Sequence, residues 1–519
     1  METLIFHAKV YLSRGKFAEA VLVRDGRIAA VGTEADAACA AGRGAERIDA
    51  GGRLLLPGFY DCHQHLIMAG RQARKVDANA ASIDELIARG RETIERIGIP
   101  KGAFVTGLGW DDAVLGRCPT REDLDRISTE HAVVLSRRCG HAMCCNTLAL
   151  RRAGIDPEGH SGMLWEGEGA PVSKAIPPET ERQKLGDLLA AVRSAHKFGI
   201  TAIATNDVRG DVDVHVRIFD ELFRDPKLRL RITEQCSIEN EAQLDGYIAA
   251  GYRTGTWLIP DFLKFGPLKL FADGSLGART AFMRAPYRDA PDTRGVRVIE
   301  PDALRRYVEK ADANGLQVAV HAIGDGAIDD VLSAYEHVID AKNQPADAHE
   351  SINSLRHGIV HCQITDSGLL SRFAKSDVLA LVQPIFLQSD RRVLTSRVGG
   401  ELASTSYAWA AMERLNIRTA YGTDCPIETA NPLENIAAAV TRYGESQNER
   451  VDVATAVDAC TAGSAYANFD EARLGRISPG MCADFALLER DIFSIPPQEI
   501  AETRVCLTIV NGEVVYEMR

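Results

Sequence analysis

The feature that most restricts the fold is an alternation of short apolar runs with longer amphipathic stretches along most of the 519-residue chain. The apolar runs are Leu54–Cys62, Thr201–Asn206, Leu228–Gln235, Leu268–Phe271, Gln317–His321, Gly358–Cys362, Val378–Val382 and Thr419–Gly422. Such runs, separated by helical segments, are typical of βα units with a buried parallel sheet. Eight units predict an α/β chain whose core is a closed (β/α)8 TIM-like barrel.

Both ends of the chain have a hairpin-like pattern instead. Asp25-Gly26 separates two apolar runs in the first segment, and Asn511-Gly512 does so in the last. Asn-Gly and Asp-Gly are strong two-residue hairpin signals, and chain termini often lie close together. We therefore expect residues 1–57 and 470–519 to form one small β-sandwich domain, and residues 58–469 to form the barrel.

The interval between the first two runs is too long for a single crossover helix. It contains further β-like runs at residues 103–107 and 132–136, which indicates an inserted cap of about residues 70–180. An insertion after strand 1 would lie at the C-terminal mouth of the barrel, where a substrate lid is expected.

Charge and composition narrow the choice of partner. The net charge is -12, with no basic stripe, which favours a small-molecule substrate over nucleic acid. No apolar stretch approaches the ~20 residues that span a bilayer, and the N-terminus lacks a signal pattern, so we expect a cytoplasmic protein with no membrane partner. The twelve cysteines include no C-x-x-C pair, unlike a zinc ribbon. The oligomeric state is open, with a homodimer as one option.

The strongest chemical signal is the pair His63 and His65, which stand two residues apart where the first apolar run ends. Strand periodicity places both imidazoles on one side. Two neutral imidazoles that converge in this way can chelate a divalent ion. A bare H-x-H motif is weak evidence, however, because it also occurs in structural or surface positions.

Other ligand-type residues fall at or near the ends of predicted strands. His321 and His361 each end a run, Asp424 follows the eighth run, and Lys269 is a polar residue inside an apolar one. The C-terminal ends of barrel strands converge on one rim, which carries catalysis. Either His321 or His361 alone could instead be a hydrogen-bonded core imidazole, but their joint placement favours a common site.

With these motifs together, the sequence resembles the amidohydrolase superfamily, in the branch of N-substituted formamide deformylase and the exoenzyme regulatory proteins. The matching stretches are Leu56–His65, Gly107–Asp111, Gly140-His141 with Asn146, Lys269–Gly277, His321–Asp325, His361–Gln363, and Gly422–Asp424 with Pro426. The resemblance covers nearly the whole chain.

The resemblance implies a metal-dependent hydrolase that cleaves a carbon–nitrogen bond of a small amide, N-formyl compound or cyclic amide. The implied metal ligands are His63, His65, Lys269, His321, His361 and Asp424. They would hold one or two divalent ions, with Zn2+ expected, and Lys269 would be carbamylated to N6-carboxylysine when it bridges two ions. An unmodified Lys269 that pairs with a carboxylate is the alternative. Asp424 is the implied catalytic residue, which passes a proton to the departing amine.

The resemblance also places Trp110, Asp111, His141 and Asn146 of the insertion at the substrate. A core aromatic is the equal alternative for Trp110. We further expect Gly274 to let the backbone approach a ligand. Arg279 is expected either to clamp a substrate carboxylate or to form an ordinary ion pair.

Two rival functions remain open at this stage. The same site could hydrolyse an ester or lactone, because only the leaving group's need for a proton differs. Alternatively, the chain could be a regulatory or ligand-binding barrel without catalysis, although the intact set of ligand residues argues against this.

Overall fold

The computed structural model describes residues 2–137, 142–342 and 351–518, except the side chain of Glu166. The chain forms two compact units, of which one contains residues 1–66 and 192–519 and the other residues 67–191. The second unit extends slightly beyond the expected insertion at both ends. The terminal β-sheets belong to the same unit as the barrel.

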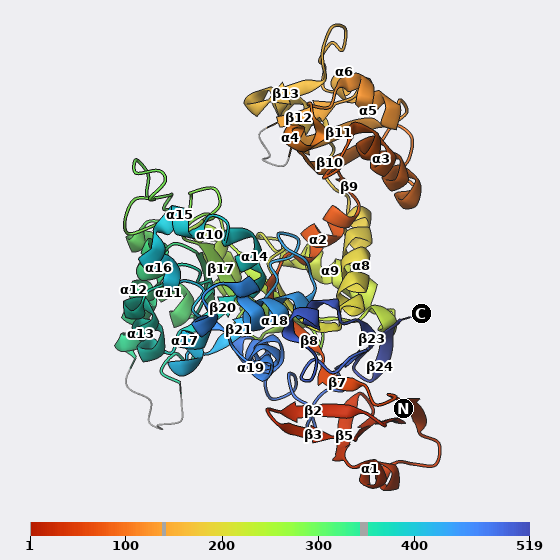
Figure 1. Ribbon diagram of the computed structural model, residues 1–519, viewed down its shortest axis with the longest axis vertical. Helices are drawn as coiled ribbons and strands as arrows, with labels where there is room; N and C mark the ends of the chain where they lie inside the picture. Colours follow the sequence, from red (N-terminus) through yellow and green to blue (C-terminus); the bar gives the residue numbers. More distant parts are fainter. Residues whose placement is uncertain (1, 138–141, 343–350, 519) are drawn as a thin grey trace. The chain divides into compact units, whose positions relative to one another are not determined.

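Eight parallel strands of the first unit form the predicted barrel (Figure 1), and their order in the sheet follows the chain. The strands are β8 (Phe59–Gln64), β14 (Ile200–Thr205), β15 (Arg231–Ser237), β17 (Leu263–Phe271), β18 (Val318–Ala322), β19 (Gly358–His361), β20 (Leu379–Val382) and β21 (Thr419–Tyr421). Beyond the end of β21, Asp424 N donates to His63 O and His65 N donates to Cys425 O, both at 2.8 Å. These bonds join the last strand to the first, so the sheet is nearly closed.

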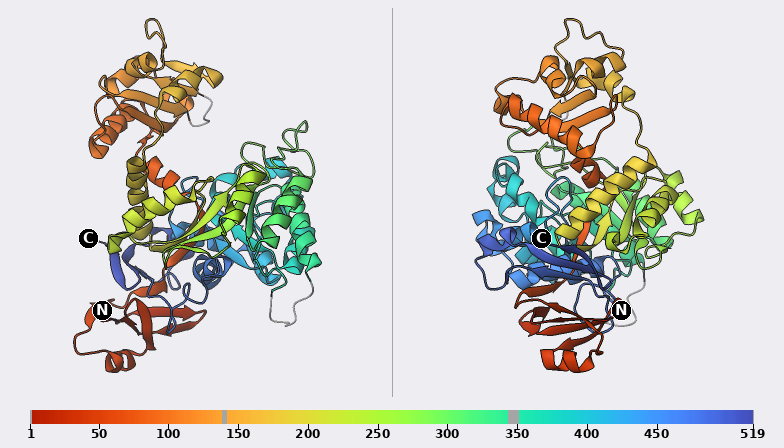
Figure 2. Two further views of the ribbon diagram at one scale, coloured as in Figure 1. Left: turned by 180° about the vertical axis from the view of Figure 1, so that it is seen from behind. Right: turned by 90° about the vertical axis from the view of Figure 1, so that its right-hand side faces the viewer.

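Helices cover the outside of the strands. The main ones are α9 (Val212–Phe223), α10 (Glu241–Ala249), α11 (Pro301–Ala313), α12 (Asp325–Ala341), α13 (Ser367–Ser376), α17 (Trp409–Arg414) and α18 (Pro432–Thr441). In α11, Leu304, Val308 and Ala311 are buried at spacings of four and three residues, which places them on one face of the helix. Helices α11, α12 and α13 lie side by side along the barrel (Figures 1 and 2).

The first predicted run is two strands rather than one. Leu54–Pro57 forms β7 in a terminal sheet, and β8 begins at Phe59 in the barrel. Gly58 separates them, and a Cβ there would lie 2.2 Å from Thr201 Oγ1. The chain changes sheets where only glycine fits against the neighbouring strand.

The two chain ends form a pair of sheets. One has the order β5-β4-β1-β6 and the other β24-β23-β22-β7-β2-β3. Their strands are β1 (Glu2–Phe6), β2 (Lys9–Ser13), β3 (Lys16–Ala18), β4 (Ala20–Arg24), β5 (Arg27–Gly32), β6 (Glu46–Asp49), β7, β22 (Phe485–Leu488), β23 (Val505–Val510) and β24 (Glu513–Glu517). Buried side chains of both sheets share one apolar cluster, which includes Val21 from the first sheet and Phe485 from the second. Asn511-Gly512 forms the predicted turn between β23 and β24.

The second unit is built on a five-stranded sheet of order β13-β12-β11-β10-β9. Its main elements are β9 (Val76–Asp77), α3 (Ile83–Ile97), β10 (Phe104–Trp110), α5 (Arg121–Ile127), β11 (Ala132–Arg137), β12 (Ala142–Cys145), α6 (Thr147–Arg152) and β13 (Met163–Trp165). The two predicted runs correspond to the first parts of β10 and β11, except that β10 begins one residue after Ala103, and the two strands pair in parallel. In neither unit does a described helix combine the length and apolar character that a membrane crossing needs.

Candidate metal centre

Two histidines point into the same region at the end of β8. The ring centroids of His63 and His65 are 5.4 Å apart. His63 Nδ1 lies 2.6 Å from Gln235 Oε1, and His65 Nδ1 lies 3.1 Å from Asn206 O. Because each Nδ1 faces an oxygen acceptor, it carries the proton, and each Nε2 keeps a lone pair for a cation.

A second contact fixes the orientation of the Gln235 amide. Its Nε2 donates to Cys62 O at 3.1 Å, so Oε1 is the atom that faces His63. Asn206 Nδ2 in turn donates to Gln235 O at 2.6 Å and to Ser237 Oγ at 2.8 Å. The ends of β14 and β15 therefore hold both histidines of β8 in place.

Asp424 lies opposite these rings. Its φ of 56° is in the left-handed region, which non-glycine residues adopt mainly where the surroundings enforce it. Asp424 Oδ1 is 3.3 Å from His63 Nε2 and 3.2 Å from His65 Nε2. Burial opposes the charged form, but the nearby imidazoles of His63 and His65 hold the pKa of Asp424 well below its usual range. The carboxylate is therefore ionised at neutral pH.

His361 and His321 come from the two adjacent strands β19 and β18. The ring centroid of His361 is 5.8 Å from that of His63 and 4.3 Å from that of His321. Burial, followed by the nearby His321, lowers the pKa of His361 well below its usual value, so this ring is neutral. His321 Nε2 lies 3.0 Å from Gly274 O, which leaves Nδ1 with the lone pair.

Three of these side chains have the geometry of a metal site. His63, His361 and Asp424 each offer one ligand atom, and these atoms all lie within 4.8 Å of one another. Within the described ranges, His361 Nδ1 and Asp424 Oδ1 are buried without a hydrogen-bond partner. Such orphaned atoms are uncommon and cost roughly 1–3 kcal/mol each. A cation would satisfy both, and a set of imidazoles with a carboxylate suits zinc and similar divalent ions.

Lys269 lies inside the barrel on β17. Its side chain is 1% exposed, and its Nζ is 3.5 Å from Leu270 O and 3.9 Å from the centroid of the Phe271 ring. Burial lowers the pKa of Lys269 to about 7, although the charges of Asp424 and Asp273 act in the opposite direction. A substantial fraction of the amine is therefore neutral at physiological pH.

A buried carboxylate fixes β8 against β21. Asp61 accepts hydrogen bonds from His63 N at 3.1 Å, Thr423 N at 3.0 Å and Thr423 Oγ1 at 2.5 Å. Beside this contact, a Cβ at Gly422 would lie 2.6 Å from His63 N, so only glycine allows the strands to come this close. Together these contacts set the position of Asp424 relative to His63.

Two of the expected substrate residues lie in the core of the second unit. Trp110 is 0% exposed, and its Nε1 donates to Leu135 O at 2.8 Å. Asn146 is also fully buried, and its Oδ1 accepts from Val133 N at 3.0 Å and Ala149 N at 2.9 Å. This burial favours the core alternative for Trp110 and gives Asn146 the role of a helix cap; neither offers a surface to a ligand in this structure.

The structure does not test substrate contact for the other two residues of the insertion, Asp111 and His141. Asp111 caps α4 (Asp112–Leu115), with its Oδ1 accepting from Ala113 N at 3.0 Å. His141 lies outside the described residues. Substrate contact by Asp111 and His141 stays a prediction.

Gly274 and Arg279 belong to the loop after β17. A Cβ at Gly274 would lie 2.3 Å from Thr280 Oγ1, so the loop itself requires this glycine, while its carbonyl oxygen faces His321. Arg279 forms a two-pronged ion pair with Asp289, with nitrogen–oxygen distances of 3.1 and 2.9 Å. The structure thus has the ion pair that was one of the two alternatives for Arg279.

The sequence reasoning did not identify the residues that support the ligands. Asn206 and Gln235 end the second and third predicted runs, which is the same positional signal that selected His321 and His361. Asp273 was also missed as a support. Its carboxylate accepts from Ile323 N at 3.0 Å and lies 3.4 Å from His321 Nε2.

Comparison with known proteins places this site in a family. Residues 46–516 match the Amidohydrolase family. The chain belongs to this family. YtcJ of Bacillus subtilis (strain 168), which carries an amidohydrolase name, is 32% identical over 98% of this chain and 97% of its own length. The amidohydrolase resemblance expected from the motifs is confirmed.

Two further proteins are similar to this amidohydrolase along nearly its whole length. N-substituted formamide deformylase of Arthrobacter pascens is 26% identical, over 97% of this chain and 96% of the relative. The crystal structure of an uncharacterized metal-dependent hydrolase from Pyrococcus furiosus superposes with a TM-score of 0.79 at 29% identity, and covers 95% of this chain and 100% of the other. The chain is therefore a hydrolase of the amidohydrolase superfamily, and its His63–His361–Asp424 group is a candidate metal site.

Proposed function

We propose that this amidohydrolase cleaves a carbon–nitrogen bond of a small amide, N-formyl compound or cyclic amide. The observation that carries the proposal is the convergence of His63, His361 and Asp424, with two buried ligand atoms that lack partners. His65, His321 and Lys269 would complete the set around one or two divalent ions, with zinc the expected metal. The deformylase relative supports this bond type, since an N-substituted formamide is its named substrate class.

A divalent ion held by these residues would supply Lewis acidity, which lowers the pKa of water toward ~7 and polarises a carbonyl. Asp424 is the residue that moves the proton. Its ionised carboxylate accepts a proton from the attacking water and returns it to the departing nitrogen. This return matters for an amide because an unprotonated amine anion is a very poor leaving group. An ester leaving group depends on it less.

His63 acts as a neutral ligand. Burial lowers the pKa of His63 to about 4, so its Nε2 does not carry a proton at neutral pH. Gln235 keeps the remaining proton on Nδ1. His63 therefore presents a lone pair to a cation without first having to lose a proton.

Lys269 is proposed to carry a carbamate. Among the described residues, its buried amine makes one long hydrogen bond, to Leu270 O, and its pKa of about 7 keeps part of it neutral. The neutral amine attacks carbon dioxide, forms an N–C bond and releases a proton. The product is an anionic group with two oxygen ligands, which suits borderline and hard cations. Isotope-edited 13C NMR with labelled bicarbonate would show the carbamate, and the signal should disappear in Lys269→Ala.

The proposal is tested by metal analysis of the native protein followed by a substrate screen. The expected result is at least one divalent ion per chain and hydrolysis within a panel of N-formyl, N-acyl and cyclic amides, lost after chelation. Asp424→Asn should abolish amide hydrolysis, while Asp302→Asn, a change at an exposed aspartate of α11, should leave it intact. Full metal occupancy with no activity against the panel would overturn the substrate class. A protein that binds no metal would overturn the mechanism.

A further inference from the structure

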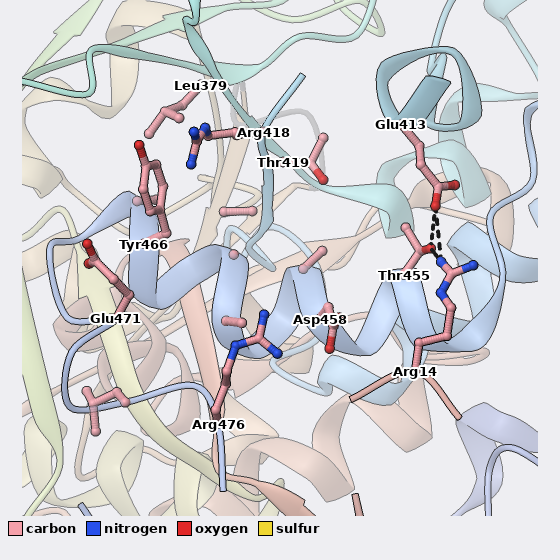
Figure 3. A pocket seen from close by; sticks show the side chains of 16 residues that line it. Arg14, Leu379, Glu413, Arg418, Thr419, Thr455, Asp458, Tyr466, Glu471 and Arg476 are labelled. Carbon is pink, nitrogen blue, oxygen red and sulfur yellow. Dashed lines mark hydrogen bonds and ion pairs between the residues drawn. The ribbon is translucent and has the colours of Figure 1, made fainter. Parts of the chain in front are cut away.

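A pocket of about 580 Å³ lies at the opposite end of the barrel from the candidate metal centre (Figure 3). Leu379 and Thr419, the first residues of β20 and β21, line it, whereas Asp424 follows the far end of β21. Arg14, which follows β2 in the N-terminal sheet, lines the same pocket. All of its lining residues belong to the first unit.

One wall of the pocket is a helical run with small side chains. The run consists of α19 (Val453–Asp458), the π-helical segment η6 (Ala459–Gly463) and α20 (Ser464–Ala467). Ala459, Ala462, Gly463 and Ala467 face the pocket, and a Cβ at Gly463 would lie 2.4 Å from Thr419 O. Single-turn π segments often occur at functional sites. Between the larger side chains of Asp458 and Tyr466, this part of the wall therefore carries little side-chain volume.

The acidic residues of the pocket already have partners. Glu413 binds Arg14 at 3.1 Å, and Asp458 accepts from Tyr11 OH at 3.0 Å. Glu471 accepts two hydrogen bonds from Arg356, at 2.6 and 2.9 Å. The carboxylates are therefore matched within the protein.

Two of the three arginines are not matched in this way. Arg476 makes no hydrogen bond or ion pair with any described residue. Its positive charge acts on Asp458 from a distance: burial raises the pKa of Asp458, and Arg476 lowers it. Within the part of the chain that the structure describes, Arg418 forms an ion pair only through its Nε, at 3.4 Å from Asp377 Oδ1, and its guanidinium lies 4.3 Å from the centroid of the Tyr466 ring. Figure 3 shows both side chains around the small-residue wall. Their terminal nitrogens are free to form forked contacts with a planar or tetrahedral anion.

We propose that this pocket is a second ligand site, separate from the metal centre, which binds a small molecule through a carboxylate or phosphate group. Arg476 and Arg418 hold the anionic oxygens. The alanines and the Tyr466 ring contact the rest of the molecule. The proposal does not depend on the substrate class of the hydrolase.

Isothermal titration of the full-length, metal-loaded protein tests the site, with inorganic phosphate and succinate as separate probes at constant ionic strength. Saturable binding is expected for at least one probe. Arg476→Gln and Arg418→Gln should each weaken it at least tenfold. Arg504→Gln is the control, because this exposed arginine pairs with Glu489 outside the pocket. Thermal unfolding verifies that each variant is folded, and Arg476→Lys, which keeps the charge but loses the fork, should bind with intermediate affinity.

The response to the two probes separates a carboxylate ligand from a phosphate ligand. The proposal is overturned if neither phosphate nor succinate binds saturably to the wild-type protein. Binding that survives both substitutions also overturns it, because the anion would then occupy another place, such as the metal centre.

Discussion

Replacement of Gln235 by leucine is a direct test of how the ligands are held. The side chain fits the same volume but loses the oxygen that accepts from His63 Nδ1 at 2.6 Å and the amide that donates to Cys62 O. His63 Nδ1–H would then be buried without a partner, at a cost of about 1–3 kcal/mol. The ring can escape this cost only by moving its proton or by turning away, and either change disturbs the Nε2 lone pair.

The expected result is a loss of metal affinity. Removal of a residue that orients a ligand typically weakens binding 10- to 100-fold, which corresponds to about 1.4–2.7 kcal/mol. Competition with a chromophoric zinc chelator measures this directly, without the need for a substrate. A fall in zinc affinity would be accompanied by a loss of stability of similar size.

Gln317→Leu is the matched control. Gln317 is also buried, and its Nε2 donates to Arg356 O at 2.6 Å and to Ala467 O at 3.0 Å, away from the candidate ligands. This variant should lose comparable stability with unchanged zinc affinity. If Gln235→Leu kept wild-type zinc affinity, or if both variants weakened zinc equally, the orienting role assigned to Gln235 would be refuted.

Three further predictions concern residues outside this contact. Trp110→Ala should destabilise the second unit by about 3–5 kcal/mol, because it empties a fully buried site. A free energy of unfolding in urea close to that of the wild type would show that the ring is not a core residue. Gly422→Ala should lower zinc affinity, since its Cβ would lie 2.6 Å from His63 N, and chelator competition showing no change would contradict the close approach. Burial lowers the pKa of His196 from 6.5 to about 4 in the folded protein. As the pH falls below 6.5, the unfolded chain therefore binds a proton at His196 while the folded protein does not. The free energy of unfolding decreases as the pH falls from 6.5 toward 4. Between pH 7 and pH 5 the wild type should lose about 2 kcal/mol more stability in urea titrations than His196→Gln, and equal losses would contradict this assignment.

The barrel could be predicted because its buried parallel strands are continuous apolar runs. The errors in the strand bounds occur at glycine and proline, which end a strand at Pro57-Gly58 but lie inside one at Gly266-Pro267. Only Leu268–Phe271 was expected for β17, yet the strand begins at Leu263 and continues through Gly266-Pro267. A shift in register places these two residues opposite one residue of β15. Such a bulge accommodates proline within a sheet, and a local pattern does not reveal it.

The ligand residues could be predicted because they follow strands that converge on one rim. Their supports Asn206 and Gln235 end predicted strands in the same way, but the strand pattern does not show which ligand each of them contacts, such as Gln235 with His63. In the second unit, the sequence suggested a site residue where the structure has a core residue. The motif that contains Trp110 suggested a substrate contact, but a tryptophan in a core and a tryptophan in a site have the same sequence signature, and only its burial distinguishes them.

The bond between Asp61 and Thr423 has a consequence for how the protein is made. These residues are 362 positions apart, and together they set His63 against Asp424. During translation, a nascent chain that stops before β21 exposes imidazoles but lacks the carboxylate that completes the donor group. A metal held by the proposed donor group would therefore gain its full set of ligands only after the ribosome has synthesised the last barrel strand.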